Sequence, residues 1–165
     1  MAWKGLVYKM TISNIYDGIK DYIKNNLERY LDSVEDIAVP MVKSILRSST
    51  VDVLGLKLYP AMMMEYGRSE GEAGTTTADF YTLPITFYFI SSGGDIDKLQ
   101  RLSEEYVDAL KRLFEYDPSL GGLVGNTRIE GWEFSPSLPR NTSFVHMGLL
   151  YVNFEKKIMK NKEDR

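Results

Sequence analysis

Two stretches of the chain have the hydrophobic spacing of long amphipathic helices. In residues 13–32 an apolar side chain recurs at every fourth position, and in residues 96–116 leucines and aromatic residues form one continuous stripe. Ser13 and Asp95 stand where an N-cap would accept hydrogen bonds from the first free backbone N–H groups. The spacing therefore predicts two helices, each burying one face.

The remaining apolar stretches predict strands. Residues 56–66 and 79–92 carry aromatic and branched side chains and are expected to pair as one hairpin. Residues 127–134 and 143–155, joined by a loop at 135–141, are expected to form a second hairpin. The last strand is apolar at both odd and even positions, which predicts a central strand covered on both faces.

The segments between these elements are less regular. Residues 67–77 contain three glycines and no large apolar side chain, so we expect a long, mobile, acidic hairpin tip. Pro40 interrupts an apolar stretch, and a short helix over 40–47 with proline in its first turn is predicted. Residues 1–10 and 156–165 are expected to be an N-terminal arm and a charged, flexible tail.

The order of these elements indicates the fold class. A chain of 165 residues, 44% of them hydrophobic, is the usual size of one domain and can fill a core. We therefore expect a single α+β domain over residues 1–165. Its sheet is predicted to be mostly antiparallel and built from two hairpins, with the helices 13–32 and 96–116 packed on it.

Composition removes several classes of chemistry. Without cysteine the chain has no disulfide, no thiolate zinc site and no iron–sulfur cluster, and its single histidine leaves few metal or acid–base constellations. The formal charge of −3, from 20 basic and 23 acidic residues, argues against a domain that grips phosphates by bulk charge. We expect no cofactor and no metal.

Targeting signals are not evident either. The first ten residues have no apolar run long enough for a signal peptide, and no stretch of the sequence is apolar enough for a transmembrane helix. We therefore expect a soluble product of cytosolic synthesis without a membrane partner.

The residues that could carry chemistry do not form a recognisable catalytic or binding motif. His146 lies alone in the middle of a strand, which is typical of a partly exposed histidine without a catalytic partner. The glycines of residues 121–126 follow a helix and lack the Lys-Ser/Thr of a phosphate loop, so they predict a turn. Paired carboxylates such as Glu104 and Glu105 are typical of solvated helix faces. No catalytic residue is predicted, and we expect a protein that is not an enzyme.

Several local phrases resemble one family of viral assembly proteins. They are Leu58-Tyr59-Pro60-Ala61 before the first hairpin, the Gly/Thr-rich tip, the strand 83–90 leading into helix 96–116, and Asp117-Pro118-Ser119-Leu120-Gly121-Gly122-Leu123-Val124 before the last hairpin. With the leading helix, this pattern resembles the tail-terminator and neck proteins of tailed bacteriophages and related prophage particles. The resemblance spans about residues 11–155.

That resemblance implies a function in assembly. It implies a subunit that forms a hexameric ring on the finished tail tube, stops tube growth and joins the tail to the filled head. The implied partners are further copies of the chain, the tail tube protein and a head-completion or connector protein. DNA would pass through the lumen without specific binding. The implied location is the virion, and the host cytoplasm during assembly.

A ring subunit needs edges or arms that bind its neighbours, and a lumen that does not grip DNA. Arg68, Glu70, Glu72 and Asp79, near one hairpin tip, are therefore interface or lumen candidates. Other interpretations remain open: a head-completion or connector protein of the same particle, a small cytosolic acid–base hydrolase, or a small ligand-binding module.

Overall fold

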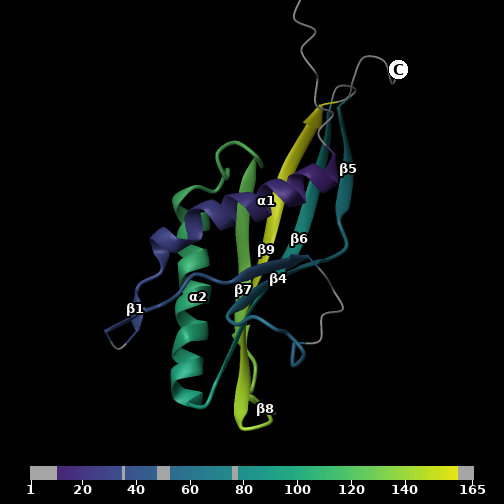
Figure 1. The fold of residues 1–165 in the computed structure, drawn as a ribbon. Coiled ribbons are helices and arrows are strands. Elements are labelled where there is room, and N and C mark those ends of the chain that lie inside the picture. The colour runs from purple at the N-terminus through teal and green to yellow at the C-terminus, as the bar shows by residue number, and fades with distance from the viewer. Residues whose placement is uncertain (1–10, 35, 48–52, 76–77, 160–165) are drawn as a thin grey trace, which may run out of the picture.

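The computed structural model describes residues 11–34, 36–47, 53–75 and 78–159. Figure 1 shows the arrangement of the helices and strands. In chain order these are α1 (Ile12–Asn26), the 3₁₀ helix η1 (Leu27–Tyr30), β1 (Ser33–Val34), β2 (Ile37–Ala38), β3 (Ser44–Arg47), β4 (Ala61–Tyr66), β5 (Glu70–Thr75), β6 (Ala78–Gly93), α2 (Ile96–Tyr116), β7 (Asn126–Phe134), β8 (Leu138–Arg140) and β9 (Ser143–Met159).

Seven of the strands form one mixed sheet. Its main path is β3-β4-β6-β9-β7, with β5 also pairing with β6 and β8 also pairing with β9. Every pairing is antiparallel except that of β3 with β4. This mostly antiparallel sheet with two helices agrees with the predicted α+β class. The sheet is more elaborate than two hairpins, because β3, β5 and β8 extend it.

The centre of the sheet is the long pairing of β6 with β9. It runs in unbroken register from Ala78 opposite Met159 to Gly93 opposite Phe144. Alternate residues of β6 face the helices, and of these Leu83, Ile85 and Phe87 are at most 1% exposed. The predicted central position of the last strand is confirmed. Its expected cover on both faces is not, because Tyr151, Asn153 and Glu155 on the face away from the helices are only partly buried.

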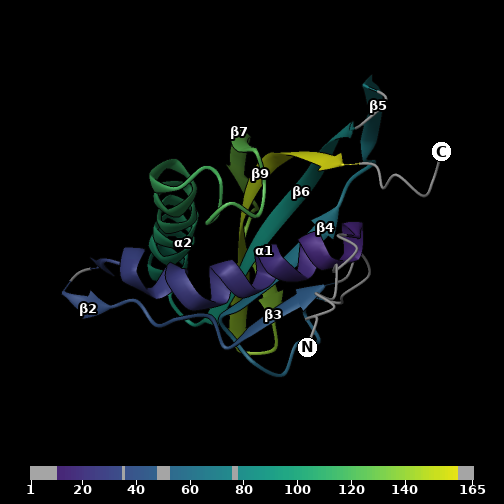
Figure 2. The same ribbon diagram turned by 90° about the horizontal axis from the view of Figure 1, so that it is seen from above.

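Both helices pack on the same face of this sheet (Figure 2). Rings from the sheet and from α2 interlock beneath them: Phe114 lies 5.6 Å from Phe87 and 5.5 Å from Phe154, centroid to centroid. Phe89 stacks on Tyr106 at 5.3 Å. The helix stripes complete this core with Ile15, Ile19, Ile23 and Leu27 of the first helical segment and Val107, Leu110 and Leu113 of α2.

The two predicted helices are present with adjusted ends. The first begins at Ile12, because Thr11 rather than Ser13 accepts the capping hydrogen bond, from the Asn14 backbone N–H at 3.2 Å. Its last turn tightens into the 3₁₀ helix η1. The second spans Ile96–Tyr116 as predicted, with the Asp95 carboxylate capping the Lys98 N–H.

The short helix predicted over 40–47 is wrong. Residues 44–47 form β3, which lies parallel to β4 with Ser44 opposite Ala61. Pro40 cannot donate a backbone hydrogen bond, and its carbonyl accepts one from the Tyr106 hydroxyl at 2.6 Å. Residues 44–47 form a strand because the edge of β4 has free backbone groups with which they can pair.

The loop predicted over 67–77 is also largely wrong. Only residues 67–69 are irregular; Glu70–Thr75 forms β5, with Glu70 opposite Thr82 and Glu72 opposite Phe80 of β6. Strand pairing uses backbone groups, so the long β6 can order a segment without apolar side chains. Residues 76–77 lie outside the described part of the chain.

The chain ends differ from the prediction where they are described. Residues 156–159 of the expected tail continue β9, because β6 extends far enough to pair with them. Residues 160–165 and the expected arm 1–10 lie outside the described residues. The expected loop 135–141 contains the short strand β8.

Two local features fix how the elements join. Asp117 accepts hydrogen bonds from the Tyr22 hydroxyl at 3.0 Å and the Gly121 N–H at 2.7 Å, which ties the turn after α2 to α1. Gly121 and Gly122 have positive φ, as the predicted turn requires.

The strand β7 contains a bulge. Its register with β9 shifts between Ile129 and Gly131, so that Glu130 is an extra residue. Beyond the bulge Trp132 pairs with Leu150, and the Lys111 ammonium lies 3.9 Å from the centre of the indole ring.

Packing of the helix stripes yields the first prediction. Ile23 and Leu110 are fully buried, so Ile23→Ala and Leu110→Ala should each lower the free energy of unfolding by about 2–5 kcal/mol. Urea denaturation measures the loss. Glu115→Ala, on the exposed side of α2, is the control and should change it by less than about 0.5 kcal/mol. A loss below about 0.5 kcal/mol at both buried sites would contradict the observed faces.

Candidate functional site: the open face of the sheet and its arm

The face of the sheet opposite the helices is polar over most of its area. Two tyrosines on it donate hydrogen bonds to carboxylates: Tyr88 to Glu65 at 2.5 Å and Tyr151 to Glu133 at 2.9 Å. Partial burial raises the pKa of Tyr88, and the hydrogen bond to Glu133 raises that of Tyr151. Both phenols therefore stay neutral and keep donating to their carboxylate partners.

One end of this face has an apolar cover. Met63, Ile90 and Val145 form a small cluster there, with Leu56 and Tyr59 packed against it. Away from that end, no other described element packs on this face of the strands β4, β6, β9 and β7.

At the other end the sheet projects as an arm. We use this name for β5, residues 78–82 of β6 and residues 155–159 of β9. Figure 2 shows these strands extending beyond both helices. Phe80 and Met159 on the arm are 44% and 62% exposed. On the helix side Tyr81 and Ile158 of the arm still pack against the main core, whereas Phe80 on the open face has little apolar cover.

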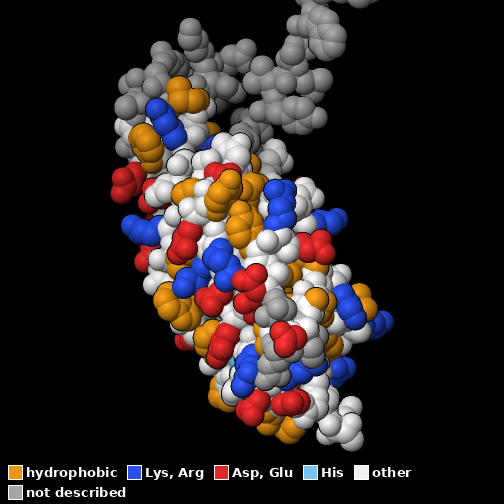
Figure 3. All heavy atoms as spheres, turned by 90° about the vertical axis from the view of Figure 1, so that its left-hand side faces the viewer, with side chains coloured by type: hydrophobic (Ala, Val, Ile, Leu, Met, Phe, Trp, Pro, Cys, Tyr) orange, Lys and Arg blue, Asp and Glu red, His pale blue; other side chains and the backbone are white. Residues whose placement is uncertain are grey.

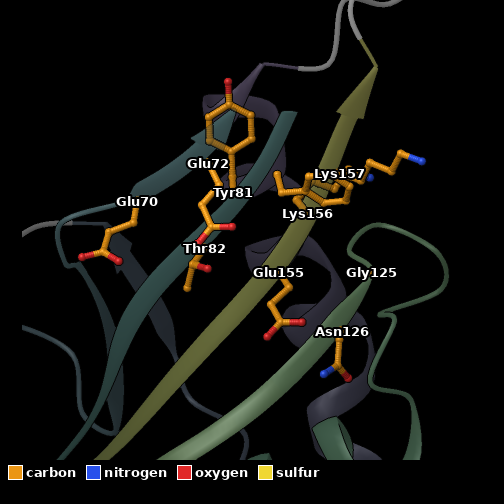
Figure 4. Close-up of a pocket in the computed structure, with 10 residues that line it drawn as sticks. Glu70, Glu72, Tyr81, Thr82, Gly125, Asn126, Glu155, Lys156 and Lys157 are labelled. Atoms are coloured by element: carbon orange, nitrogen blue, oxygen red, sulfur yellow. The ribbon is translucent and has the colours of Figure 1, made fainter. Parts of the chain in front are cut away.

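A hollow of about 420 Å³ lies on the open face where the arm meets β7. The register aligns Glu70, Thr82, Glu155 and Asn126 in one row across four strands. Glu72, Phe80 and Lys157 form the next row. Figure 4 shows how the labelled residues of these two rows line the hollow.

The hollow combines negative charge with an exposed ring. Glu70, Glu72 and Glu155 supply three carboxylates, and the Lys157 ammonium lies 5.8 Å from the centre of the Phe80 ring. Lys156 donates to the Leu123 carbonyl at 2.6 Å, towards the helix side. Figure 4 shows both lysines leaving β9 on the side away from Glu70. The site suits a partner that carries both basic and apolar groups.

The structure separates the four candidates named from the sequence. Glu70 and Glu72 share the open face and line the hollow. Asp79 is opposite Ile158 and belongs by alternation to the other face, although a smaller hollow of about 230 Å³ is lined by both Asp79 and Glu72. Arg68 lies exposed in the link between β4 and β5. Sequence reasoning missed Glu155, which strand register alone brings beside Glu70.

The helix side carries charges of both signs. Lys, Arg, Asp and Glu are interspersed there without a patch of one sign (Figure 3). The interpretation of paired carboxylates as solvated faces fails for Glu105, whose side chain is only 13% exposed. It accepts from the Asp32 backbone N–H at 2.7 Å and from Arg112 at 2.8 Å, linking α2 to the end of η1.

His146 is buried, not partly exposed as predicted. It is 1% exposed because its position in the alternation faces α2, where the Ser103 hydroxyl lies 2.7 Å from Nδ1. The opposite residue on β6 is Ser91, whose buried hydroxyl has no partner among the described residues. A cleft of about 410 Å³, lined also by Gln100 and Glu104, adjoins the histidine.

This pair is placed for packing rather than for attack on a substrate. Ser103 has no exposed surface, so its hydroxyl cannot meet a substrate carbonyl in this conformation. Burial lowers the pKa of His146, and the nearby Glu104 carboxylate opposes that shift. The imidazole is therefore neutral at pH 7.

Neither a metal-binding cluster nor a membrane-spanning helix is found among the described residues. The histidine, aspartates and glutamates in this part of the chain form no group of three or more that could hold a metal ion. None of its helices is both long and apolar enough to cross a membrane.

Comparison with models of known protein families found no match. Comparison with curated proteins also found none. The resemblance to tail terminators thus stays a prediction from the sequence.

Burial of His146 generates a prediction for stability against pH. Because its folded-state pKa lies below the unfolded value of about 6.5, the unfolded chain binds more protons as the pH falls. The free energy of unfolding should therefore be level above pH 7 and decline below about 6.5. Denaturant titrations from pH 8 to 5.5 measure this decline.

The control is His146→Gln, which keeps a polar side chain but does not titrate. The free energy of unfolding of this variant is expected to be lower than that of the parent chain. Between pH 7 and 5.5 it should change less steeply with pH than in the parent chain. Equal slopes would show that His146 does not govern this pH range.

Proposed function

We propose that the chain is a structural virion assembly protein, a tail terminator that caps the completed tail tube as a hexameric ring and forms the head–tail joining interface. In this role it acts by assembly and not by catalysis. The observation that carries the proposal is the arm, which projects beyond the helices with Phe80 and Met159 exposed.

Exposed strand edges support self-association. Among the described strands, the outer edge of β5 and that of β7 have no partner. Free edges on opposite sides of one sheet favour contacts between unlike surfaces of neighbouring copies. Contacts of this head-to-tail kind generate closed rings when the rotation between copies is suitable.

The open face supports a passage for DNA. Glu65, Glu133 and the carboxylates of the hollow give it negative charge, with Arg128 paired to Glu130 beside them. A lumen lined in this way repels phosphates and offers no grip on a moving duplex. Glu70 and Glu72 are the lumen candidates that agree with this arrangement, and Asp79 on the opposite face does not.

A tube-capping experiment tests the proposal. The purified chain is mixed with tail tubes of the particle that encodes it, and the tube ends are imaged by negative stain. We expect a ring at one end of each tube and no further elongation when tube protein is added. Rings that bind portal-bearing heads but leave tubes uncapped would instead indicate the head-completion or connector function.

Variants locate the contact on the arm. Phe80→Ser should weaken capping by at least about tenfold, as expected for an aromatic residue at an interface. Tyr116→Ser, at a position 79% exposed at the end of α2, is the matched control and should cap normally. A chain that neither caps tubes nor binds heads overturns the proposed function. Equal capping by both variants would show that the arm does not contact the tube.

A further inference from the structure

The hollow on the arm has a chemical complement within the same chain. Residues 1–10, Met-Ala-Trp-Lys-Gly-Leu-Val-Tyr-Lys-Met, contain two lysines, no acidic residue and several large apolar side chains. The hollow offers three carboxylates, Glu70, Glu72 and Glu155, and an exposed ring in Phe80. Its two lysines, Lys156 and Lys157, leave β9 on the side away from Glu70 (Figure 4) and so leave the carboxylates available. Oppositely charged groups flanking an apolar contact are the usual pattern of a specific peptide site.

The described chain begins close to the arm. Thr11 caps α1, and one turn later the Tyr16 ring stacks on Tyr66 at 3.9 Å. The Tyr16 hydroxyl is 3.2 Å from that of Ser69, the residue that precedes β5. The start of α1 is therefore held beside the start of the arm.

The segment is long enough to reach the hollow. Ten extended residues span up to roughly 33–36 Å. The path from the outer edge of β5 to β9 crosses two strand spacings of about 4.8 Å, and passing to the other face adds about 10 Å. Residues 1–10 can thus wrap round the edge of β5 with length to spare.

We propose that residues 1–10 dock on the open face of the arm of their own chain. Lys4 and Lys9 face the carboxylates of Glu70, Glu72 and Glu155, and apolar side chains of the segment cover Phe80. The proposal does not depend on the function proposed above, because it concerns the single free chain.

Trp3 provides the measurement. Trp132→Phe removes the other tryptophan of the full chain, so that fluorescence reports on Trp3 alone. In this background we expect Trp3 emission at shorter wavelength, and weaker quenching by acrylamide, than in the synthetic peptide of residues 1–10. Both differences should shrink as salt is added, because exposed charge pairs are screened.

Charge variants locate the docking site. Glu70→Gln with Glu72→Gln should raise the ratio of undocked to docked segment by about five- to tenfold, the loss expected for two exposed ion pairs. Glu65→Gln with Glu133→Gln, on the same face but outside the hollow, is the matched control and should leave Trp3 unchanged. Lys4→Glu with Lys9→Glu should release Trp3, and adding Glu70→Lys with Glu72→Lys should restore docking.

Three results would overturn the proposal. In the first, Trp3 in the full chain behaves as in the free peptide. In the second, the control pair releases Trp3 as strongly as the pair in the hollow. In the third, protection of Trp3 rises with protein concentration, which would make the occupant a second copy. The lysine variants leave the folded surface intact and keep the test valid if the Glu70 and Glu72 variants unfold.

Discussion

The sixteen-residue antiparallel pairing of β6 with β9 is the constraint on which the other contacts depend. Side chains alternate along both strands, so this one register decides which residues face the helices. It puts Phe87 and Phe154 under Phe114, and it puts Tyr88 and Tyr151 on the opposite face with their carboxylate partners. A slip of one residue would exchange the two sets, burying carboxylates and exposing the aromatic core.

The same pairing also runs past the end of the core. Where the helices no longer cover β6 and β9, the strands continue as the arm and order β5 along their edge. Backbone hydrogen bonds can hold such an extension, but they leave groups such as Phe80 without an apolar cover. A surface of this kind gains most from a partner, whether that partner is a neighbouring copy or a segment of the same chain.

The sequence predicts best those elements whose pattern is local. For helix 96–116 and the strand that precedes it, the apolar pattern and the residues that begin and end the element all lie in the local sequence. The strands β3 and β5 were missed because each is ordered by a partner, β4 or β6, rather than by its own composition. His146 was misplaced because β9 is apolar at both odd and even positions, so its pattern does not say which face meets α2. Glu155 and Glu70 stand 85 positions apart, and only the register through Thr82 makes them neighbours.

The bulge at Glu130 has a consequence for how the gene can change. Before it, Ile129 points to the helices; after it, the even-numbered Trp132 and Phe134 do so. Deletion of one residue here would move the side chains of one half of β7 to the opposite face of the sheet. Substitutions on either side of the bulge keep the alternation. Natural variants of the chain should therefore accept replacements in β7 readily and conserve its length strictly. Variation in length is better accommodated at residues 68–69 in the link between β4 and β5, beyond the Gly67 N–H that still donates to the Pro84 carbonyl of β6.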